Sequence, residues 1–127
     1  MSFPSRPRPV VVLVDDDRAV AQAVQFSFDL EGLDVRGYRD GESLLAEGEP
    51  PGDGCLVLDL HLPGMDGLEL LERLRLRGVR TPAVLITTNP RAHVRNRAAA
   101  AGVPIIEKPL LTDALLTTVR GAIAHRG

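Results

Sequence analysis

The sequence has few cysteine and aromatic residues. Its 127 residues include one cysteine, no tryptophan and only 3% aromatic residues. One cysteine excludes an internal disulfide and a multi-cysteine metal site, and because Cys55 lies in an apolar run we expect its thiol to be buried and inert. The three histidines, His61, His93 and His125, lack the spacing of metal ligands, which argues against a zinc site.

Long apolar runs and a strong charge of one sign are also missing. The opening MSFPSRPRP contains arginines, but the apolar run that follows at 10–14 spans only five residues before acids interrupt it. It is too short for a signal peptide or a membrane span, so we expect a cytoplasmic protein without membrane contact. The formal net charge of -2 provides no global basic field that would recruit nucleic acid. A solvated helix face is the best interpretation of the local arginine cluster, which comprises Arg73, Arg75, Arg77 and Arg80.

The hydrophobic content of 44% is enough for a core that needs neither disulfides nor a structural metal. We therefore expect one domain over residues 1–127, with a core from about residue 9 to residue 125.

Apolar periodicity divides the chain into alternating strands and helices. Strands are expected at 10–14, 33–37, 55–59, 82–87 and 103–106. Helices are expected from the first acids to about Gly32, and at 41–47, 67–77, 92–101 and 111–125. The apolar stripe of the first helix is expected to comprise Val20, Val24, Phe28 and Leu30, and Thr112 with Asp113 behind it is the expected start of the last helix.

Five strands that alternate with five helices predict a doubly wound α/β fold, with a parallel sheet covered on both faces. In such sheets ligands bind outside the carboxyl ends of the strands, where the strand order reverses. The polar residues at the strand ends are therefore the candidates for function.

Those strand ends carry three kinds of chemistry. Asp59 closes a buried strand, and a carboxylate is costly to bury unless a positive charge holds it. Crowded carboxylates favour Mg²⁺, and Lys108 and the Thr87 hydroxyl suit phosphoryl oxygens. Asp59 would then be the nucleophile that forms an aspartyl phosphate. The full set of strand-end residues is Asp15, Asp16, Asp17, Asp59, Thr87, Thr88 and Lys108.

Each of these residues taken alone has a simpler explanation. Asp15 or Asp17 would more often be a helix N-cap, and Asp17 is the better candidate for that role. Lys108 before Pro109 would be an ordinary surface lysine, and Thr87 would satisfy a local backbone group. Their joint placement at four strand ends is what favours a functional site.

The residues around these positions resemble the receiver domains of two-component response regulators, from Val11 to about Ala124. VLVDDD resembles the acidic pocket of that family, LVLDLHLPGMDG its phosphorylation loop, LITT its switch hydroxyl region and EKP its lysine followed by proline. The resemblance implies a flavodoxin-like sheet in the order 2-1-3-4-5. It also implies a cis peptide between Lys108 and Pro109.

Site roles follow from the resemblance residue by residue. It implies Asp59 as the phosphoacceptor, Thr87 as the switch hydroxyl and Lys108 as a contact of the phosphoryl group. Mg²⁺ would be held by carboxylate oxygens of Asp16 and Asp59 and by the backbone carbonyl of His61. Asp15 would act partly through water, and the His61 imidazole would not be a ligand.

The resemblance also implies partners. These are a histidine kinase or phosphotransfer protein as donor and a downstream protein target, with no direct nucleic acid contact. The resemblance also allows a phosphorylation-dependent dimer. The expected partner face is formed by the fourth helix, the fifth strand and the fifth helix. The sequence leaves open whether the chain is a stand-alone receiver or a piece of a longer regulator.

Two residues depart from the family pattern. Ile105 stands where the family usually has Tyr or Phe, three residues before the lysine, so relay of the signal through that ring is not expected in its usual form. Thr88 stands where the family mostly keeps a very small residue, and it would narrow access to the site. Asn89 and His61 lie where related domains tune phosphate lifetime, so we hypothesise an unusual autodephosphorylation rate.

Two other function classes compete with a phosphorylatable receiver. One is a receiver-like binding module that signals without phosphorylation, which the Ile105 departure keeps open. The other is an enzyme or nucleotide binder of similar architecture. A phosphatase of the haloacid dehalogenase type would need an acid where His61 stands, and a flavin or dinucleotide site would need a loop less repellent to phosphate than DDD.

Overall fold

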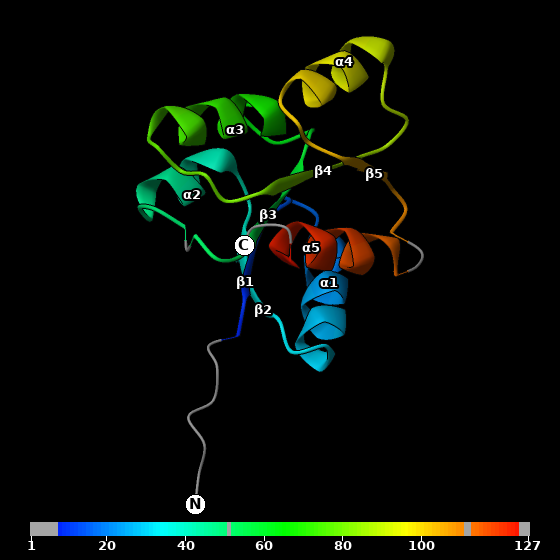
Figure 1. Cartoon of the computed structure of the whole chain (residues 1–127). Helices are drawn as coiled ribbons and strands as arrows, with labels where there is room; N and C mark the ends of the chain where they lie inside the picture. Colours follow the sequence, from blue (N-terminus) through cyan, green and yellow to red (C-terminus); the bar gives the residue numbers. More distant parts are fainter. Residues whose placement is uncertain (1–7, 51, 111–112, 125–127) are drawn as a thin grey trace, which may run out of the picture.

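The computed structural model of the chain describes residues 8–50, 52–110 and 113–124, and it has the alternating strands and helices that the sequence predicts (Figure 1). The strands are β1 (Val10–Val14), β2 (Asp34–Tyr38), β3 (Cys55–Asp59), β4 (Ala83–Thr87) and β5 (Ile105–Glu107). The helices are α1 (Arg18–Leu30), α2 (Gly41–Ala46), α3 (Gly67–Leu76), α4 (Ala92–Ala100) and α5 (Ala114–Ala124).

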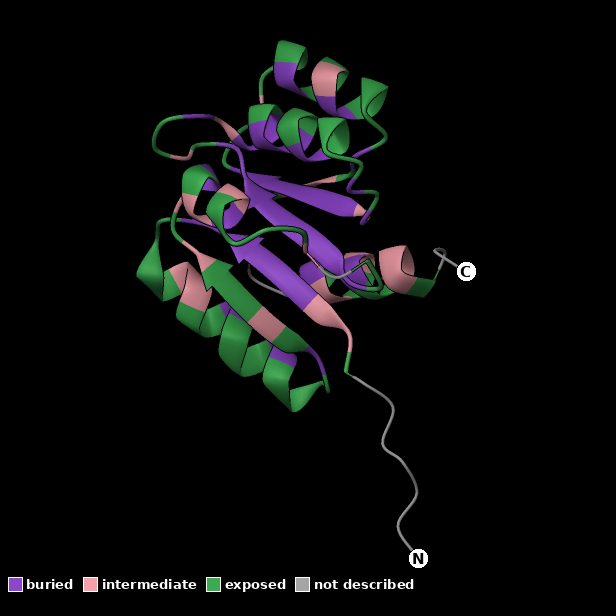
Figure 2. Ribbon diagram, turned by 90° about the vertical axis from the view of Figure 1, so that its left-hand side faces the viewer, coloured by how far each residue is buried: buried purple, intermediate pink, exposed green. Residues whose placement is uncertain are grey.

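The strands form one parallel sheet in the order β2-β1-β3-β4-β5, which confirms the predicted topology. Helices α1 and α5 cover one face, and α2, α3 and α4 cover the other (Figures 1 and 2). The three central strands are buried while β2 lies exposed at an edge, as Figure 2 shows. Among the described residues, no helix combines the length and the apolar character needed to cross a bilayer.

Alternate residues of the central strands serve two separate halves of the core. Leu56 and Leu58 of β3 face the layer of α2, α3 and α4, whereas Cys55 and Val57 face α1 and α5. Strands buried on both faces therefore read as continuous apolar runs in the sequence. Cys55 is fully buried, as expected, and its burial raises the pKa of the thiol to about 12, which disfavours the reactive thiolate.

Three strands begin later than predicted: β4 begins at Ala83 in place of residue 82, and β2 and β5 begin later for a shared physical reason. Leu33 and Val103 were expected to start strands, but each follows a left-handed glycine that ends a helix. The Leu33 amide donates to the Phe28 carbonyl at 3.0 Å, and the Val103 amide donates to the Ala98 carbonyl at 2.9 Å. Both residues thus belong to helix C-caps, in which a buried apolar residue follows the glycine.

The apolar stripe of α1 is shorter than predicted. Val24 and Phe28 are buried and Val20 is half-buried, but Leu30 is 72% exposed, so its assignment to the stripe was wrong. Leu30 lies two residues beyond Phe28, about 200° further around the helix, and therefore faces away from the core.

The last helix is present where it was predicted, within the described residues. The predicted start at Thr112 and the end at residue 125 lie outside the described residues, and α5 is described from Ala114 to Ala124.

All four clustered arginines are exposed, as predicted for a solvated face. Two of them also donate to backbone carbonyls, Arg75 to those of Val79 and Thr81 and Arg77 to that of Leu45.

Gly67 lets the first turn of α3 press against the end of β3. A Cβ atom at this position would collide with the carbonyl oxygen of Asp59, whereas a Cβ at Gly121 in α5 would meet no atom of the described residues within 4 Å. The absence of a side chain at Gly67 therefore fixes how closely α3 approaches Asp59.

These two helical glycines give a matched pair of substitutions. Gly67→Ala should lower the free energy of unfolding by about 1–3 kcal/mol, because the backbone has to move to accept the methyl group. Gly121→Ala should raise it by about 0.5–1 kcal/mol, because alanine is the better helix former and has room. Urea denaturation of both variants measures the difference, and equal effects at the two positions would contradict the close approach.

Candidate functional site

The candidate site lies at the carboxyl ends of β1 and β3, where the strand order reverses. Asp15 directly follows β1, Asp59 is the last residue of β3, and both residues are only 4% exposed. Lys108 follows β5 and reaches across the sheet edge toward them. The structure therefore brings together residues that are 93 positions apart at most, counting from Asp15 to Lys108 (108 − 15).

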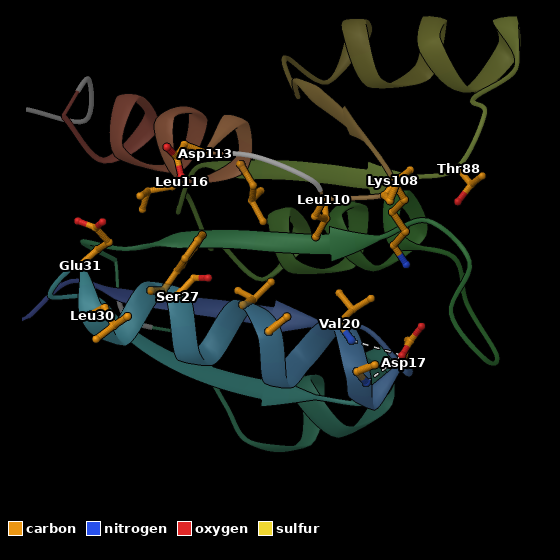
Figure 3. Close-up of a pocket in the computed structure, with 16 residues that line it drawn as sticks. Asp17, Val20, Ser27, Leu30, Glu31, Thr88, Lys108, Leu110, Asp113 and Leu116 are labelled. Carbon is orange, nitrogen blue, oxygen red and sulfur yellow. Dashed lines mark hydrogen bonds between the residues drawn. The ribbon is translucent and has the colours of Figure 1, made fainter.

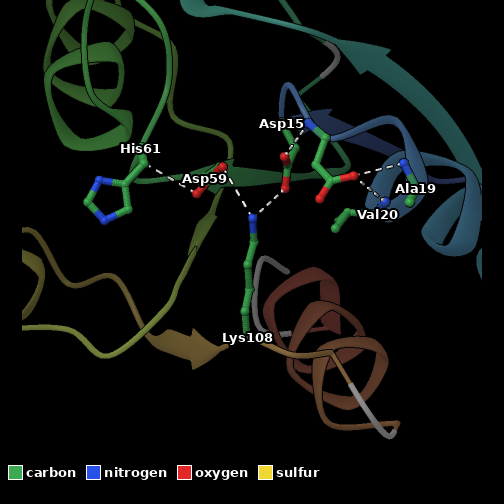
Figure 4. Close-up of polar contacts among 7 residues, drawn as sticks. Asp15, Ala19, Val20, Asp59, His61 and Lys108 are labelled. Carbon is green, nitrogen blue, oxygen red and sulfur yellow. Dashed lines mark hydrogen bonds and ion pairs between the residues drawn. The ribbon is translucent and has the colours of Figure 1, made fainter.

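A single ammonium group holds the two buried carboxylates. Lys108 Nζ lies 3.0 Å from Asp15 Oδ2 and 3.2 Å from Asp59 Oδ2, and it donates a hydrogen bond to the latter (Figure 4). The contact with Asp15 Oδ2 is an ion pair without hydrogen-bond geometry, and this oxygen accepts no hydrogen bond within the described part of the chain. Two carboxylates thus share one cation, which leaves negative charge uncompensated.

Asp16 completes an oxygen cluster that fits a divalent cation. One carboxylate oxygen each of Asp15, Asp16 and Asp59 lie within 4.8 Å of one another, and Asp16 is exposed while the other two are buried. Hard oxygen donors that leave positions open to water are the set that Mg²⁺ prefers. A divalent ion bound there would offset the negative charge that Lys108 leaves uncompensated.

The backbone of the loop after β3 also holds Asp59. The His61 amide donates to Asp59 Oδ1 at 3.2 Å, while the His61 imidazole points away from the acid cluster (Figure 4). We call residues 60–66, between β3 and α3, the phosphorylation-loop segment. The role of the His61 carbonyl stays a prediction.

Asp17 has the simpler role that the sequence analysis favoured. Its Oδ1 accepts hydrogen bonds from the amides of Ala19 and Val20, which makes it the N-cap of α1. Asp15 Oδ1 in turn accepts from the Asp17 amide at 2.8 Å, so Asp15 both orders this turn and lines the acid cluster.

Thr87 carries an unsatisfied hydroxyl. The residue is the last of β4 and is fully buried, and its Oγ1 finds no hydrogen-bond partner among the described residues. A buried polar atom without a partner is costly, so this hydroxyl at the end of β4 is free to bind a further group. The neighbouring Thr88 is exposed, and Asn89 adopts a left-handed conformation with φ 49°.

The pKa values of Asp59 and Lys108 are both raised, for different reasons. Burial, and then the nearby charge of Asp15, raise the pKa of the Asp59 carboxyl, while Lys108 and the His61 amide oppose this shift. Burial acts to lower the pKa of Lys108, but its contacts with Asp15 and Asp59 raise that pKa overall. Burial and the charge of Asp15 thus disfavour the ionised form of Asp59.

The sequence analysis missed a groove and two ion pairs near the site. A groove of about 680 Å³ runs between α1 and α5, and Lys108 and Thr88 lie at its end next to the acid cluster (Figure 3). The ion pairs join Arg95 to Glu107 and Arg97 to Asp66. No spacing rule relates such distant residues, so only the assembled fold reveals them.

The predicted cis peptide between Lys108 and Pro109 is present. Ile105, at the position of the family's aromatic residue, is half-buried and packs against the core on the side of α3 and α4.

Curated relatives of this chain are transcriptional regulators. The transcriptional regulatory protein TrcR of Mycobacterium tuberculosis is 34% identical over 114 residues, covering 89% of this chain and 44% of TrcR. The transcriptional regulatory protein FixJ of Azorhizobium caulinodans is 32% identical over 116 residues, covering 91% of this chain and 55% of FixJ. The chain thus spans about half the length of these two relatives.

Solved structures and a family model agree with this relationship. The structure of FixJ-N superposes with a TM-score of 0.83 at 29% identity, covering 94% of this chain and 97% of that one. The response regulator StyR gives a TM-score of 0.85 at 32% identity, covering 94% of this chain and 63% of StyR. The model of the response regulator receiver domain matches residues 11–120. By its fold, its relatives and this match over most of its length, the chain belongs to the response regulator receiver domain family.

Proposed function

We propose that this receiver domain, residues 1–127, accepts a phosphoryl group on Asp59 from a histidine kinase or phosphotransfer protein. The observation that carries the proposal is the shared ion pair in which Lys108 Nζ lies within 3.2 Å of carboxylate oxygens of both Asp15 and Asp59. The ion pair supports the proposal because Asp59, as a carboxylate nucleophile, would have a cation beside it during the reaction.

The proposed reaction forms a phosphorus–oxygen bond on Asp59. A carboxylate oxygen of Asp59 attacks the phosphorus of a phosphohistidine, and the phosphorus–nitrogen bond breaks. The electron pair of that bond stays on the nitrogen that carried the phosphoryl group, and the proton already on the other ring nitrogen of the phosphohistidine lets the ring leave as neutral imidazole. Lys108 then moves its hydrogen bond from the carboxylate to a phosphoryl oxygen, and Thr87 Oγ1 gains the partner it lacks.

Asp15, Asp16 and Asp59, with the backbone carbonyl of His61, would hold Mg²⁺ beside this reaction. When bound, the ion offsets the negative charge of the carboxylates and of the incoming phosphoryl oxygens. The carboxylates of Asp15 and Asp16 keep the ion near Asp59, and Asp15 contributes in part through water.

The output of the domain is proposed to be a change in its contacts with another protein. Reorientation of the Thr87 hydroxyl toward the phosphoryl group would alter the end of β4, and through it the surface formed by α4, β5 and α5. A downstream protein, or a second copy in a phosphorylation-dependent dimer, would bind the altered surface. A role in signalling is supported by the names of the relatives, which are transcriptional regulatory proteins. The chain matches about half of the length of each.

One observation favours a second candidate, a binding module that signals without phosphorylation. Ile105 replaces the aromatic side chain expected by resemblance, and it packs against the core rather than lying free at the surface. The acids, the hydroxyl and the lysine are all present, however, which favours the phosphorylated receiver.

The proposed phosphoacceptor can be tested by intact-protein mass spectrometry. Wild-type protein incubated with Mg²⁺ and a small phosphodonor should gain the mass of one phosphoryl group, and Asp59→Asn should not. Asp17→Asn is the matched control, because asparagine caps helix α1 as well as aspartate does and the variant should label like the wild type. Wild-type protein without any increment would favour the binding module instead.

The raised pKa of Asp59 predicts how the stability of the protein depends on pH. Because the folded-state pKa of Asp59 is raised above its ordinary value of 3.8, the protein without metal should lose stability as pH rises through that raised pKa. Asp59→Asn should therefore have the higher Tm in chelator at pH 7. The difference should disappear below pH 3.8.

Added Mg²⁺ should reverse this order of stability. The ion should raise the Tm of the wild type and have little effect on Asp59→Asn, because binding stabilises only the folded state that holds it. Differential scanning fluorimetry with Na⁺ at matched ionic strength supplies the control. An equal response of the two proteins to Mg²⁺ would place the ion elsewhere.

Thr88 is proposed to restrict access to the phosphorylated site. The residue is exposed and lines the groove beside Lys108. Thr88→Ala should therefore speed the decay of the phosphorylated protein, because a hydrolytic water reaches the site more easily. Following the loss of label over time compares the two proteins, and identical decay rates would remove the claim.

A further inference from the structure

Helix α4 is attached to the rest of the protein by few apolar side chains. It buries only Val94 and Ala98, whereas α3 buries a glycine and four leucines. Its N-cap residue, Arg91, makes no side-chain cap hydrogen bond, and the first turn has no acidic residue to offset the helix dipole. The position of α4 therefore depends on other contacts.

One such contact joins α4 to the segment that carries Lys108. Arg95 Nη2 lies 2.7 Å from Glu107 Oε1, and Glu107 is the last residue of β5. Glu107 pairs with Thr87 in the sheet, and the amide of Lys108 donates to the Thr87 carbonyl at 2.8 Å. Arg95 thus holds the backbone from which Lys108 reaches Asp59.

A second contact joins α4 to the other side of Asp59. Arg97 Nη1 lies 3.4 Å from Asp66 Oδ2, and Asp66 is the N-cap of α3. The next residue, Gly67, presses against the Asp59 carbonyl, and its amide donates to the Leu60 carbonyl at 3.0 Å. Arg97 thus holds the end of the phosphorylation-loop segment.

We propose that Arg95 and Arg97 are positioning residues, which act through α4 to hold Lys108 and the phosphorylation-loop segment in place around Asp59. The proposal rests on the proposed function. The same two ion pairs would also couple phosphorylation of Asp59 to the mobility of α4, and at equilibrium this coupling acts in both directions. This gives the chain a route from Asp59 to α4 that does not need an aromatic side chain at Ile105.

The size of the effect follows from the exposure of the pairs. Side chains of Arg95 and Glu107 are 54% and 55% exposed, and those of Arg97 and Asp66 are 39% and 30% exposed. Exposed pairs are individually weak, and they matter here because α4 buries so little. A change of about two- to fivefold in local exchange or in rate corresponds to the strength of such pairs.

Hydrogen exchange with mass spectrometry tests the two pairs in the intact chain. In Arg95→Gln/Arg97→Gln, amide exchange in α4 should rise about two- to fivefold, and the rate of labelling by a small phosphodonor should fall by a similar factor. High salt should bring the wild type toward the variant. Phosphorylation should change α4 exchange in the wild type but not in the double variant.

Two control variants separate positioning from general destabilisation. Arg91→Gln removes the same charge from the same helix, but Arg91 has no ion pair with the residues that the structure describes, so it should exchange and label like the wild type. Arg95→Lys/Arg97→Lys keeps the charges and should restore most of the labelling rate.

Two results would overturn the proposal. One is a double variant whose α4 exchange and labelling rate equal those of the wild type, and the other is an Arg91→Gln effect of the same size. Failure of the wild type to label would refute the proposed function instead, whereas α4 exchange in the unphosphorylated double variant would still decide whether the pairs hold the helix.

Discussion

The ion pair of Lys108 with two buried carboxylates is the interaction on which the site depends. A single ammonium group cannot neutralise Asp15, Asp16 and Asp59 together, so the folded protein retains uncompensated negative charge where its strands converge. Burial raises the pKa of Asp59, the nearby charge of Asp15 adds to that shift, and the excess charge explains why the cluster fits a divalent cation. The same excess makes the site responsive to a charged group that arrives or leaves.

The core of the fold and most of the site are predictable from the sequence because they depend on local patterns. Strands such as Cys55–Asp59 are buried on both faces and therefore appear as unbroken apolar runs, and the carboxyl ends of parallel strands must meet at one edge. Asp59 and Lys108 could be grouped on that basis before any contact was known. Asp17 was assigned as an N-cap from its residue type and position alone.

What the sequence could not provide depends on the assembled geometry. Leu33 and Val103 are apolar and buried, so their periodicity does not distinguish the start of a strand from a helix C-cap. The unsatisfied Thr87 hydroxyl and the close approach of Gly67 to Asp59 are distances between segments. Ion pairs of Arg95 and Arg97 likewise join elements with no fixed spacing, although they lie next to the residues that matter most.

Phosphorylation of one defined side chain is the central claim, and chemical mapping of the label tests it most directly. Hydride reduction converts an aspartyl phosphate to homoserine, and peptide sequencing by mass spectrometry then locates the converted residue. After incubation with Mg²⁺ and a small phosphodonor, the account predicts homoserine at position 59 and at no other aspartate. Conversion of another aspartate, or none at all while the protein stays folded, would contradict it.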